Sequence, residues 1–556
     1  MKKKLFLGCI SCIALLLLTA CSNDENNSID GSKINTAKSI EFQVNFSDYN
    51  KDQEANITRS AKGKAKLEQQ TIGFGNGVVA QCTLLRDTAK NKLTASTRAL
   101  DNATYTMLAY ETSTHAFKGE LKGTVVGGVF TPTSANPSII LAPGTYDFVL
   151  YNDNGYIVRN GNNLTVYRPT ANSAYIARTT QTITATPIKQ KVVFQMKHAD
   201  AKVTIRLEAY DYFPAINATL SSVNSTDISS SSVYDASTGT WAAGTSSSIS
   251  EPLQFTQSYD THTAGGVYEN SSSNSTSEIR FLPGTDVSKL KITFNSGSIY
   301  NQSMANVSFT FNPSSTLKLE ENGSYVLVVK LAYNFLYLMS DGSIGNFQKT
   351  TYGGGTKTPI AVVLSQSKRM AIALKNAAYS NKWCADTYAG METNTHVAAS
   401  QNTAISTDAT SGRDETWEAS YSTGSIGVKA NNPDFPPFYA AAHYDPGVTY
   451  TGTPALQWYL PSMNDWTYVP VVLGLTNRSQ VTSISIPWKF NMQQVAFRQV
   501  SGIPIGGSGT HYYSSTEIAG SGPQVGVLYP YNYGLNPFTV IYNDYMGFMT
   551  RPFVAY

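Results

Sequence analysis

The chain has 556 residues and a mass of 60.3 kDa, enough for three or four domains of ordinary size. Charged residues make up only 14% of it, against about 25% in an average soluble protein, while 41% hydrophobic residues exclude a wholly disordered chain. Lys2, Lys3 and Lys4 account for the whole formal net charge of +3, and residues 1–20 contain no acidic residue. The rest of the chain is therefore neutral, which argues against nucleic acid as a partner because phosphate binding needs a basic surface.

The first twenty residues are predicted to be a lipoprotein signal peptide. The three lysines precede an apolar run, Leu5–Leu18, that is too short for a membrane-spanning helix. The run ends in Leu18-Thr19-Ala20-Cys21, which resembles the bacterial lipobox, where cleavage precedes the cysteine and an acyl chain such as palmitate is attached to its thiol. We therefore expect lipid on Cys21 and an outer-membrane lipoprotein precursor, anchored without spanning. An ordinary secretory signal with a chance cysteine is the alternative.

Residues 21–60 are predicted to contain a polar tether and one strand. Ile40–Phe46 alternates apolar and polar residues strictly, which indicates a half-buried strand with Phe42, Val44 and Phe46 facing inward. A charged, polar stretch that includes Arg59 follows it.

From residue 61 to about residue 333, short strand-like segments recur between turn signals, which predicts antiparallel β-sandwiches. Pro187 precedes a new series of strands, so we divide this region into one sandwich at 61–188 and a second at 189–333. The Ser, Thr and Asn-rich tract 221–250 is expected to be a long exposed insertion in the second sandwich.

Residues 334–556 differ in composition and are predicted to form a separate α+β domain. They hold five of the six tryptophans of the chain: Trp383, Trp417, Trp458, Trp466 and Trp488. Ser462 and Asp465 have the spacing of a capping box, and the helix that they begin is expected to run to about Leu475.

No cofactor, metal site or catalytic residue is predicted. Once the signal is removed and Cys21 carries lipid, only Cys82 and Cys384 are left, too few for a disulfide framework or a cysteine zinc site; two buried thiols are expected, with a single disulfide as the alternative. The six histidines show no HExxH or paired-ligand spacing, and no Gly-x-Ser-x-Gly motif is present. We therefore expect that the chain is not an enzyme.

Two phrases, FQMKHADAKV at 194–203 and ENGSYVL at 321–327, together with the lipobox and the strand-rich middle, resemble the fimbrillin family. These proteins are the subunits of type V pili in gut and oral anaerobic bacteria. The resemblance covers roughly residues 30–333 and implies two tandem antiparallel β-sandwich domains of the transthyretin-like, Greek-key type.

The last third is similar to the C-type-lectin-like modules at the end of some of these surface proteins, through WYLPS at 458–462 and YYSSTE at 512–517. The Glu-Pro-Asn and Gln-Pro-Asp tripeptides of calcium-dependent sugar binding do not occur, so calcium-dependent sugar binding is not expected. Residues 529–534 are interpreted as an exposed aromatic loop that could stack on a sugar, although packing of these tyrosines is an equal alternative. The candidate ligand contacts are Trp417, Trp488, Tyr529, Tyr531, Tyr533 and Asn543.

The fimbrillin resemblance implies a mechanism of assembly. An Arg-specific protease removes the N-terminal strand, and a strand from another subunit takes its place. Here the removable strand would carry Phe42, Val44 and Phe46, and the processing site would be Arg59, with Arg98 as the alternative. A lectin-like domain at the end where a stalk subunit donates its strand implies the distal tip of a cell-surface fimbrium.

The first hypothesis is therefore an adhesive fimbrial subunit. Its partners would be other subunits through strand exchange, a host or bacterial surface ligand, glycans included, and the outer membrane before processing. The second hypothesis is a lipid-anchored surface glycan-binding protein that does not polymerise, and the third is an enzyme of lectin-like fold.

Overall fold

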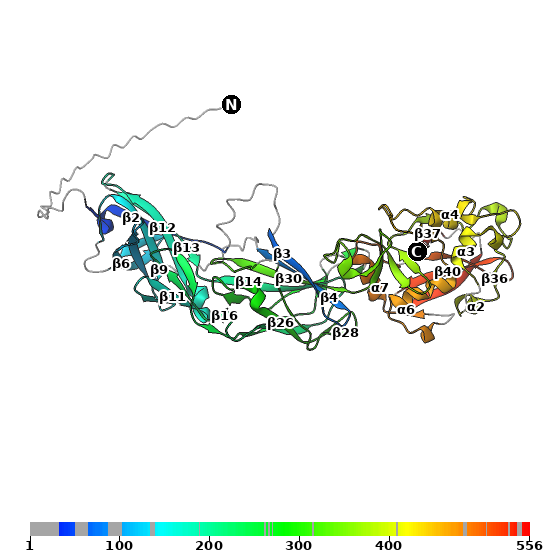
Figure 1. Ribbon diagram of the computed structural model, residues 1–556, viewed down its shortest axis with the longest axis horizontal. Helices are drawn as coiled ribbons and strands as arrows, with labels where there is room; N and C mark the ends of the chain where they lie inside the picture. The colour runs from blue at the N-terminus through cyan, green and yellow to red at the C-terminus, as the bar shows by residue number, and fades with distance from the viewer. Residues whose placement is uncertain are drawn as a thin grey trace, which may run out of the picture.

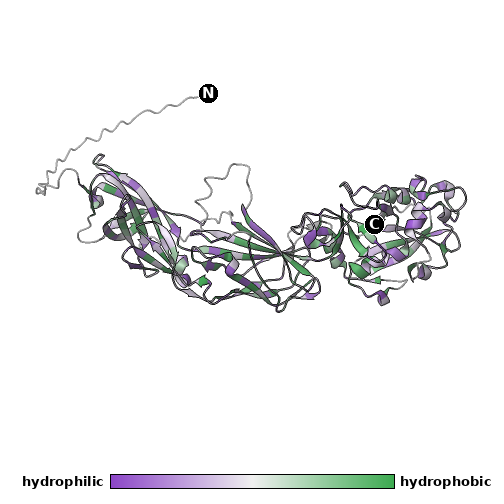
Figure 2. Ribbon diagram, in the orientation of Figure 1, coloured by the Kyte–Doolittle hydropathy of each residue, from purple (hydrophilic) through white to green (hydrophobic). Residues whose placement is uncertain are grey.

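The computed structural model describes residues 33–49, 65–86, 103–133, 139–187, 189–260, 263–264, 267–268, 271–313, 316–406, 410–481, 486–506, 509–531, 534–541 and 547–556. These residues form a mainly β protein whose three lobes follow one another in a row (Figure 1). Hydrophobic stretches concentrate on the strands of all three lobes (Figure 2). We refer to the lobes as the first, second and third domains.

The first domain is built on a closed barrel with strand order β12-β13-β2-β7-β6-β5-β9. Its strands are β2 (Ile40–Phe46), β5 (Thr104–Glu111), β6 (Phe117–Val126), β7 (Val129–Pro132), β9 (Gly144–Asn152), β12 (Tyr175–Ile183) and β13 (Gln190–His198). The first domain also contains four smaller elements: β1 (Ile34–Asn35), α1 (Thr36–Ser39), β8 (Ile140–Leu141) and the 3-10 turn η3 (Arg168–Ser173). The interior is filled by apolar side chains that alternate along the strands, such as Val192, Phe194 and Met196 of β13.

A four-stranded sheet packs on the outside of this barrel, and half of it comes from far along the chain. Its order is β10 (Ile157–Asn160), β11 (Asn163–Tyr167), β17 (Ser231–Asp235) and β18 (Thr240–Ala243). A second apolar core, with Leu164, Val166 and Tyr234, lies between this sheet and the barrel. The expectation that 221–250 is an exposed insertion is therefore wrong for Ser231–Asp235, because all five residues pair with β11 and Tyr234 packs in this core.

The second domain is a two-layered β-structure. One layer has the order β21-β24-β14-β30-β4-β3, with β25 also paired to β14. Its strands are β3 (Ala65–Gly73), β4 (Val78–Arg86), β14 (Ala201–Ala209), β21 (Tyr259–Asp260), β24 (Ser271–Asn274), β25 (Ile279–Phe281) and β30 (Ser324–Tyr333). The other layer is β20 (Ser250–Phe255), β15 (Ile216–Ser222), β26 (Leu290–Ser296) and β29 (Ser308–Thr310).

Short elements complete the second domain. They are the pairs β16 (Ile228–Ser229) with β19 (Ser246–Ser247), β22 (Thr263–Ala264) with β23 (Val267–Tyr268), and β27 (Ser298–Ile299) with β28 (Gln302–Ser303), and the turn η4 (Val287–Lys289).

The predicted division at residue 189 differs from the structure. β13 belongs to the first domain, where it pairs with β2 and β12, whereas β3 and β4 belong to the second, where β4 pairs with β30. The chain thus crosses between the two domains several times, because strands distant in sequence complete each sheet. The pairings β2–β13 and β14–β30 are also parallel, not antiparallel as expected, and strand alternation alone carries no information on direction.

The third domain combines two sheets with short helices. The first sheet is β32 (Ile344–Asn346), β31 (Leu336–Met339), β33 (Pro359–Ser365), β34 (Met370–Ala373), β43 (Phe553–Ala555) and β37 (Gln457–Tyr459). The second is β35 (Ala378–Ser380), β42 (Phe548–Thr550), β39 (Tyr512–Ile518), β40 (Gln524–Tyr531), β41 (Gly534–Ile541) and β38 (Ile486–Pro487), with β36 (Val397–Ala398) paired to β39.

The helices of the third domain are α2 (Gln401–Ser406), α3 (Gly412–Trp417), α4 (Pro436–Ala442), α5 (Met463–Trp466), α6 (Tyr468–Val472) and α7 (Phe490–Arg498). The 3-10 turns are η5 (Phe347–Lys349), η6 (Asp386–Tyr388), η7 (Ala419–Tyr421), η8 (Lys429–Asn431) and η9 (Arg478–Gln480). Within the described ranges, no helix is long and apolar enough to span a membrane.

The capping box predicted at Ser462 and Asp465 is present and begins α5. The predicted single helix up to Leu475 is instead two short helices, α5 and α6. Pro470 has no N–H to donate to the carbonyl of Trp466, which accounts for the interruption. Cys82 and Cys384 are both buried free thiols.

Candidate functional site

The strand predicted to be removable, β2, forms one wall of the barrel in the first domain. On one side it pairs with β13 in parallel over seven residue pairs, from Ile40 with Gln190 to Phe46 with Met196. On the other side it pairs with β7 at only two positions, and the amide of Val44 also donates to the carbonyl oxygen of Gly128 at 2.8 Å. β2 is thus the strand that closes the barrel.

The side chains of β2 alternate as the sequence indicated. Phe42 and Val44 are 1% and 3% exposed, and Phe46 is half-buried. The ring of Phe42 lies 6.0 to 6.2 Å from the rings of three phenylalanines of the barrel, Phe130, Phe148 and Phe194. Removing β2 would therefore open an apolar slot along the barrel wall.

The contact between β2 and β7 is incomplete near the start of β2. A groove of about 420 Å³ lies there, lined by residues 37–42, 129–132 and 189–191. Pro132 at the end of β7 has no N–H, so it offers no donor for a longer ladder at this point. β2 is therefore held by a full ladder on one side and a short one on the other.

The predicted lipidation and processing residues, Cys21, Arg59 and Arg98, lie outside the described residues. In the sequence, Arg59 stands between β2 and β3, and Arg98 stands between β4 and β5. The two sites therefore differ in which strands lie on their N-terminal side.

In the third domain, the two candidate tryptophans are held by the protein itself. Trp488 is 6% exposed, and its indole N–H donates to the carbonyl oxygen of Tyr531 at 2.8 Å. Trp417 is half-buried, and its indole N–H donates to the carbonyl oxygen of Trp458 at 2.9 Å. Burial leaves Trp488 almost no free ring face for a ligand, and part of the Trp417 ring is covered as well.

The segment interpreted as an aromatic loop is largely strand, so that interpretation is wrong for residues 529–531, which end β40. The pairing of β40 with β39 ends at Leu528, so at Pro530 the strand has a partner, β41, on one side only. A proline is tolerated at such an edge position because its missing N–H breaks no hydrogen bond there. Tyr529 and Tyr531 are half-buried on one face of β40, with ring centroids 5.8 Å apart and nearly parallel. Tyr533 and Asn543 lie outside the described residues.

His511 extends this pair into a row of three rings, since its imidazole stacks on Tyr529 at 4.5 Å. We call His511, Tyr529 and Tyr531 the ring row. The partly exposed row presents ring edges and two tyrosine side chains, a surface with both apolar and hydrogen-bonding character.

The third domain also contains a buried charged cluster that the sequence did not single out. The carboxylate of Glu517 accepts hydrogen bonds from the backbone amides of Thr393 and Asn394 at 3.0 Å, and the ammonium of Lys429 donates to the carbonyl oxygen of Thr393 at 3.0 Å. Burial lowers the pKa of Lys429 to about 8 and raises the pKa of the nearby Glu415 well above its usual value. No group of three or more His, Cys, Asp or Glu side chains suited to a metal ion occurs in the described part of the chain.

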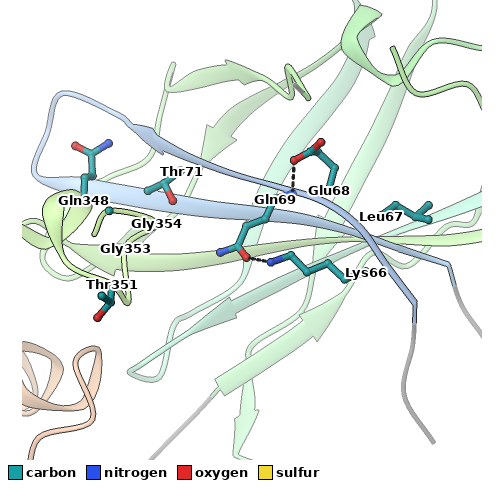
Figure 3. A pocket seen from close by; sticks show the side chains of 10 residues that line it. Lys66, Leu67, Glu68, Gln69, Thr71, Gln348, Thr351, Gly353 and Gly354 are labelled. Atoms are coloured by element: carbon teal, nitrogen blue, oxygen red, sulfur yellow. Dashed lines mark hydrogen bonds between the residues drawn. The ribbon is translucent and has the colours of Figure 1, made fainter. Parts of the chain in front are cut away.

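An open polar hollow of about 680 Å³ lies where β3 meets the turn after η5 (Figure 3). Lys66, Gln69 and Thr71 line it from β3, Gln348 lines it from η5, and Gly353–Gly355 line it from the turn (Figure 3). Lys66 donates a hydrogen bond to Gln69 across its wall. These side chains include no nucleophile with a base beside it, so they indicate no chemistry.

No protein-family model matches the chain, and no curated protein matches it. Among solved structures, the chain is similar to a fimbrial protein from Bacteroides vulgatus, with 15% identity, a TM-score of 0.26, and coverage of 45% of this chain and 93% of that one. It is also similar to a fimbrial assembly protein from Parabacteroides distasonis, with 9% identity, a TM-score of 0.24, and coverage of 46% and 94%. Other matched Bacteroides structures carry the words cell adhesion protein or adhesin in their names. With TM-scores this low, the likeness does not assign a function to the chain.

Proposed function

We propose that the chain is a structural and adhesive subunit of a cell-surface fimbria. It is exported as a lipoprotein through Cys21, cut in the segment between β2 and β3, and assembled when a strand from another subunit replaces β2. The observation that carries the proposal is the position of β2, the long strand at the N-terminal side of Arg59, which closes the barrel and contributes to its core.

The physical consequence of losing β2 favours replacement. The exposed β13 edge would carry unpaired backbone groups over seven residues, and the slot would lose the three buried side chains Ile40, Phe42 and Val44. Burying each such side chain is worth about 1.5–3 kcal/mol. An incoming strand with alternating apolar residues restores both the ladder and the core.

The fold favours Arg59 over Arg98 as the processing site. A cut after Arg98 places β3 and β4 on the N-terminal fragment, and β4 is an internal strand that pairs with β30 over nine residues and buries Val79, Cys82 and Leu84. Release of that fragment would dismantle the second domain. A cut after Arg59 leaves both strands in place.

We assign the subunit to the distal tip, with residues 334–556 as the adhesin domain. β43 pairs with β34 on one side and β37 on the other, so its backbone is not free to add to a second subunit. The ring row is the candidate contact for a surface ligand such as a glycan. The proposal gives the chain no catalytic reaction.

The mature N-terminus of protein extracted from the cell surface tests the proposal. Intact-mass measurement and N-terminal sequencing should find Ser60 as the first residue of the assembled form. Lipidated Cys21 at the N-terminus of every molecule would contradict it and favour the alternative, a lipid-anchored glycan-binding protein that does not polymerise.

A further inference from the structure

The three residues after β2 leave the first domain and end in contact with the second. The phenol of Tyr49 donates a hydrogen bond of 2.8 Å to Oδ1 of Asp200, and it accepts one from the guanidinium of Arg280. Arg280, on β25, also donates to Asp200 at 3.3 Å. Tyr49 thus completes a polar cluster between the two domains.

The ring of Tyr49 also makes several contacts. It stacks on the imidazole of His198 with centroids 4.0 Å apart and planes 9° apart. The ammonium of Lys202 and the guanidinium of Arg280 lie 5.0 and 5.4 Å from its centroid, within the range of cation–π attraction. We call His198, Asp200, Lys202 and Arg280 the phenol socket.

The phenol socket is built for a hydroxyl-bearing ring. The side chain of Asp200 is fully buried, so its carboxylate depends on donors inside the protein. Burial and the neighbouring carboxylate raise the pKa of Tyr49 far above its usual value, which keeps its proton available for Asp200. A phenylalanine would fill the space but would leave Asp200 without this donor.

Tyr49 lies on the same segment as β2, ten residues before Arg59, so a cut after Arg59 that frees β2 also empties the phenol socket. Asp200 would then lose the hydrogen bond from the phenol, and the face of His198 would lose its stacked ring. We propose that the phenol socket is a second recognition site for the incoming strand of another subunit. The strand would carry alternating apolar residues at the positions of Ile40, Phe42 and Val44, and a tyrosine five residues after the last of them.

This inference rests on the proposed function, and it adds the chemistry of the partner segment. A strand with the tyrosine fills the slot in the first domain and also ties the first domain to the second. A strand with the same apolar pattern but without the tyrosine fills the slot alone. The phenol socket would therefore distinguish two strands that fit the barrel equally well but differ in whether they carry the tyrosine.

The first test measures peptide binding to the full chain after it has been cut by an Arg-specific protease. The parent peptide spans residues 37–49, and its Tyr49→Phe version lacks only the hydroxyl. Because hydrogen bonds to charged groups are worth about 1.5–3 kcal/mol, the parent should bind at least about tenfold more tightly. An Asp48→Ala version is the matched control, since the side chain of Asp48 is exposed, and it should bind like the parent.

The outcomes separate the two ideas. Equal binding of the parent and Tyr49→Phe peptides, both tight, would overturn the phenol socket and leave strand replacement standing. Absence of binding by all three peptides would contradict strand replacement, and the inference with it.

A second test examines the phenol socket without any cleavage. The uncut Tyr49→Ala chain has a hole where the phenol was, and p-cresol is a Tyr side chain without its backbone. We expect p-cresol to recover part of the lost thermal midpoint while toluene, which has no hydroxyl, does not. Equal effects of the two compounds would show that the phenol socket does not read the hydroxyl and would overturn the inference.

Discussion

Asn322 binds the last residue of β13 in both directions: its amide donates to the carbonyl oxygen of His198 at 3.0 Å, and its side-chain oxygen accepts from the amide of His198 at 3.2 Å. Its side-chain nitrogen also donates to the carbonyl oxygen of Asp48 at 3.0 Å. The two phrases at 194–203 and 321–327 that resemble fimbrillins therefore meet at the junction of the first and second domains. Asn322, in the turn before β30, there binds both β13 and the segment that follows β2.

Asn322→Ala should destabilise this junction by about 2–4 kcal/mol. The backbone of Asn322 has a φ of 57°, which costs alanine about 1–2 kcal/mol, and two side-chain hydrogen bonds are lost at about 1 kcal/mol each. Asn322→Gly removes only the hydrogen bonds and should cost less than alanine. Urea unfolding of both variants gives the comparison, and equal losses would show that backbone conformation has no role here.

Phe42→Ala should destabilise the first domain by about 3–5 kcal/mol, because the ring is 1% exposed and packs among three phenylalanines. Glu41→Ala on the same strand is the control, since Glu41 is exposed. Denaturant unfolding of the uncut chain measures both. A loss below about 1 kcal/mol for Phe42→Ala would mean that β2 contributes little to the core.

Arg59→Ala should block incorporation into filaments, whereas Arg98→Ala should leave it normal. The reason is that only a cut at Arg59 frees β2 without also detaching β3 and β4. Immunoblotting of sheared surface filaments measures incorporation, and the mature mass of each variant gives the site of cleavage. The reverse pattern would assign processing to Arg98.

Glu415→Gln should flatten the pH dependence of stability of the third domain between pH 5 and 7. Burial raises the pKa of Glu415 well above its usual value of 4.5. At a pH between these two pKa values, the carboxyl group keeps its proton in the folded state and has lost it in the unfolded state. Stability then falls as pH rises, by at most about 1.4 kcal/mol per pH unit. Lys429, with a pKa lowered to about 8, releases its proton mainly above this window.

Thermal unfolding of Glu415→Gln and of Glu418→Gln across that pH range gives the comparison, because Glu418 is exposed on the neighbouring turn. The Glu418 variant should follow the wild type. Parallel curves for the wild type and Glu415→Gln would show that Glu415 is ionised in the folded protein.

Trp488→Ala should lower the stability of the third domain by about 3–5 kcal/mol, since its ring is packed and its N–H holds the end of β40. Tyr529→Ala should cost less stability and should reduce adhesion, because Tyr529 is the central member of the ring row. Melting curves and glycan-array binding of the full-length variants measure the two effects. Unchanged binding by Tyr529→Ala would remove the ring row as the ligand contact.

Local patterns in the sequence determined several elements correctly. The alternation in Ile40–Phe46 predicts β2 and the burial of Phe42, because a strand places alternate residues on opposite faces. Ser462 and Asp465 predict the start of α5, because a capping box is made between residues three apart. Each of these signals is contained within a few residues.

Only the tertiary structure decided which strands share a sheet. Nothing near β3 and β4 indicates that they belong with β30, and nothing near β17 indicates that it pairs with β11, because these partners are chosen by the fit of distant apolar faces. The contact of Tyr49 with Asp200 could not be predicted from the sequence either, because the two residues lie 151 positions apart. The sequence by itself determined that residue 49 follows a strand with alternating apolar residues; the folded chain decided that the phenol of Tyr49 lies at the junction between two domains.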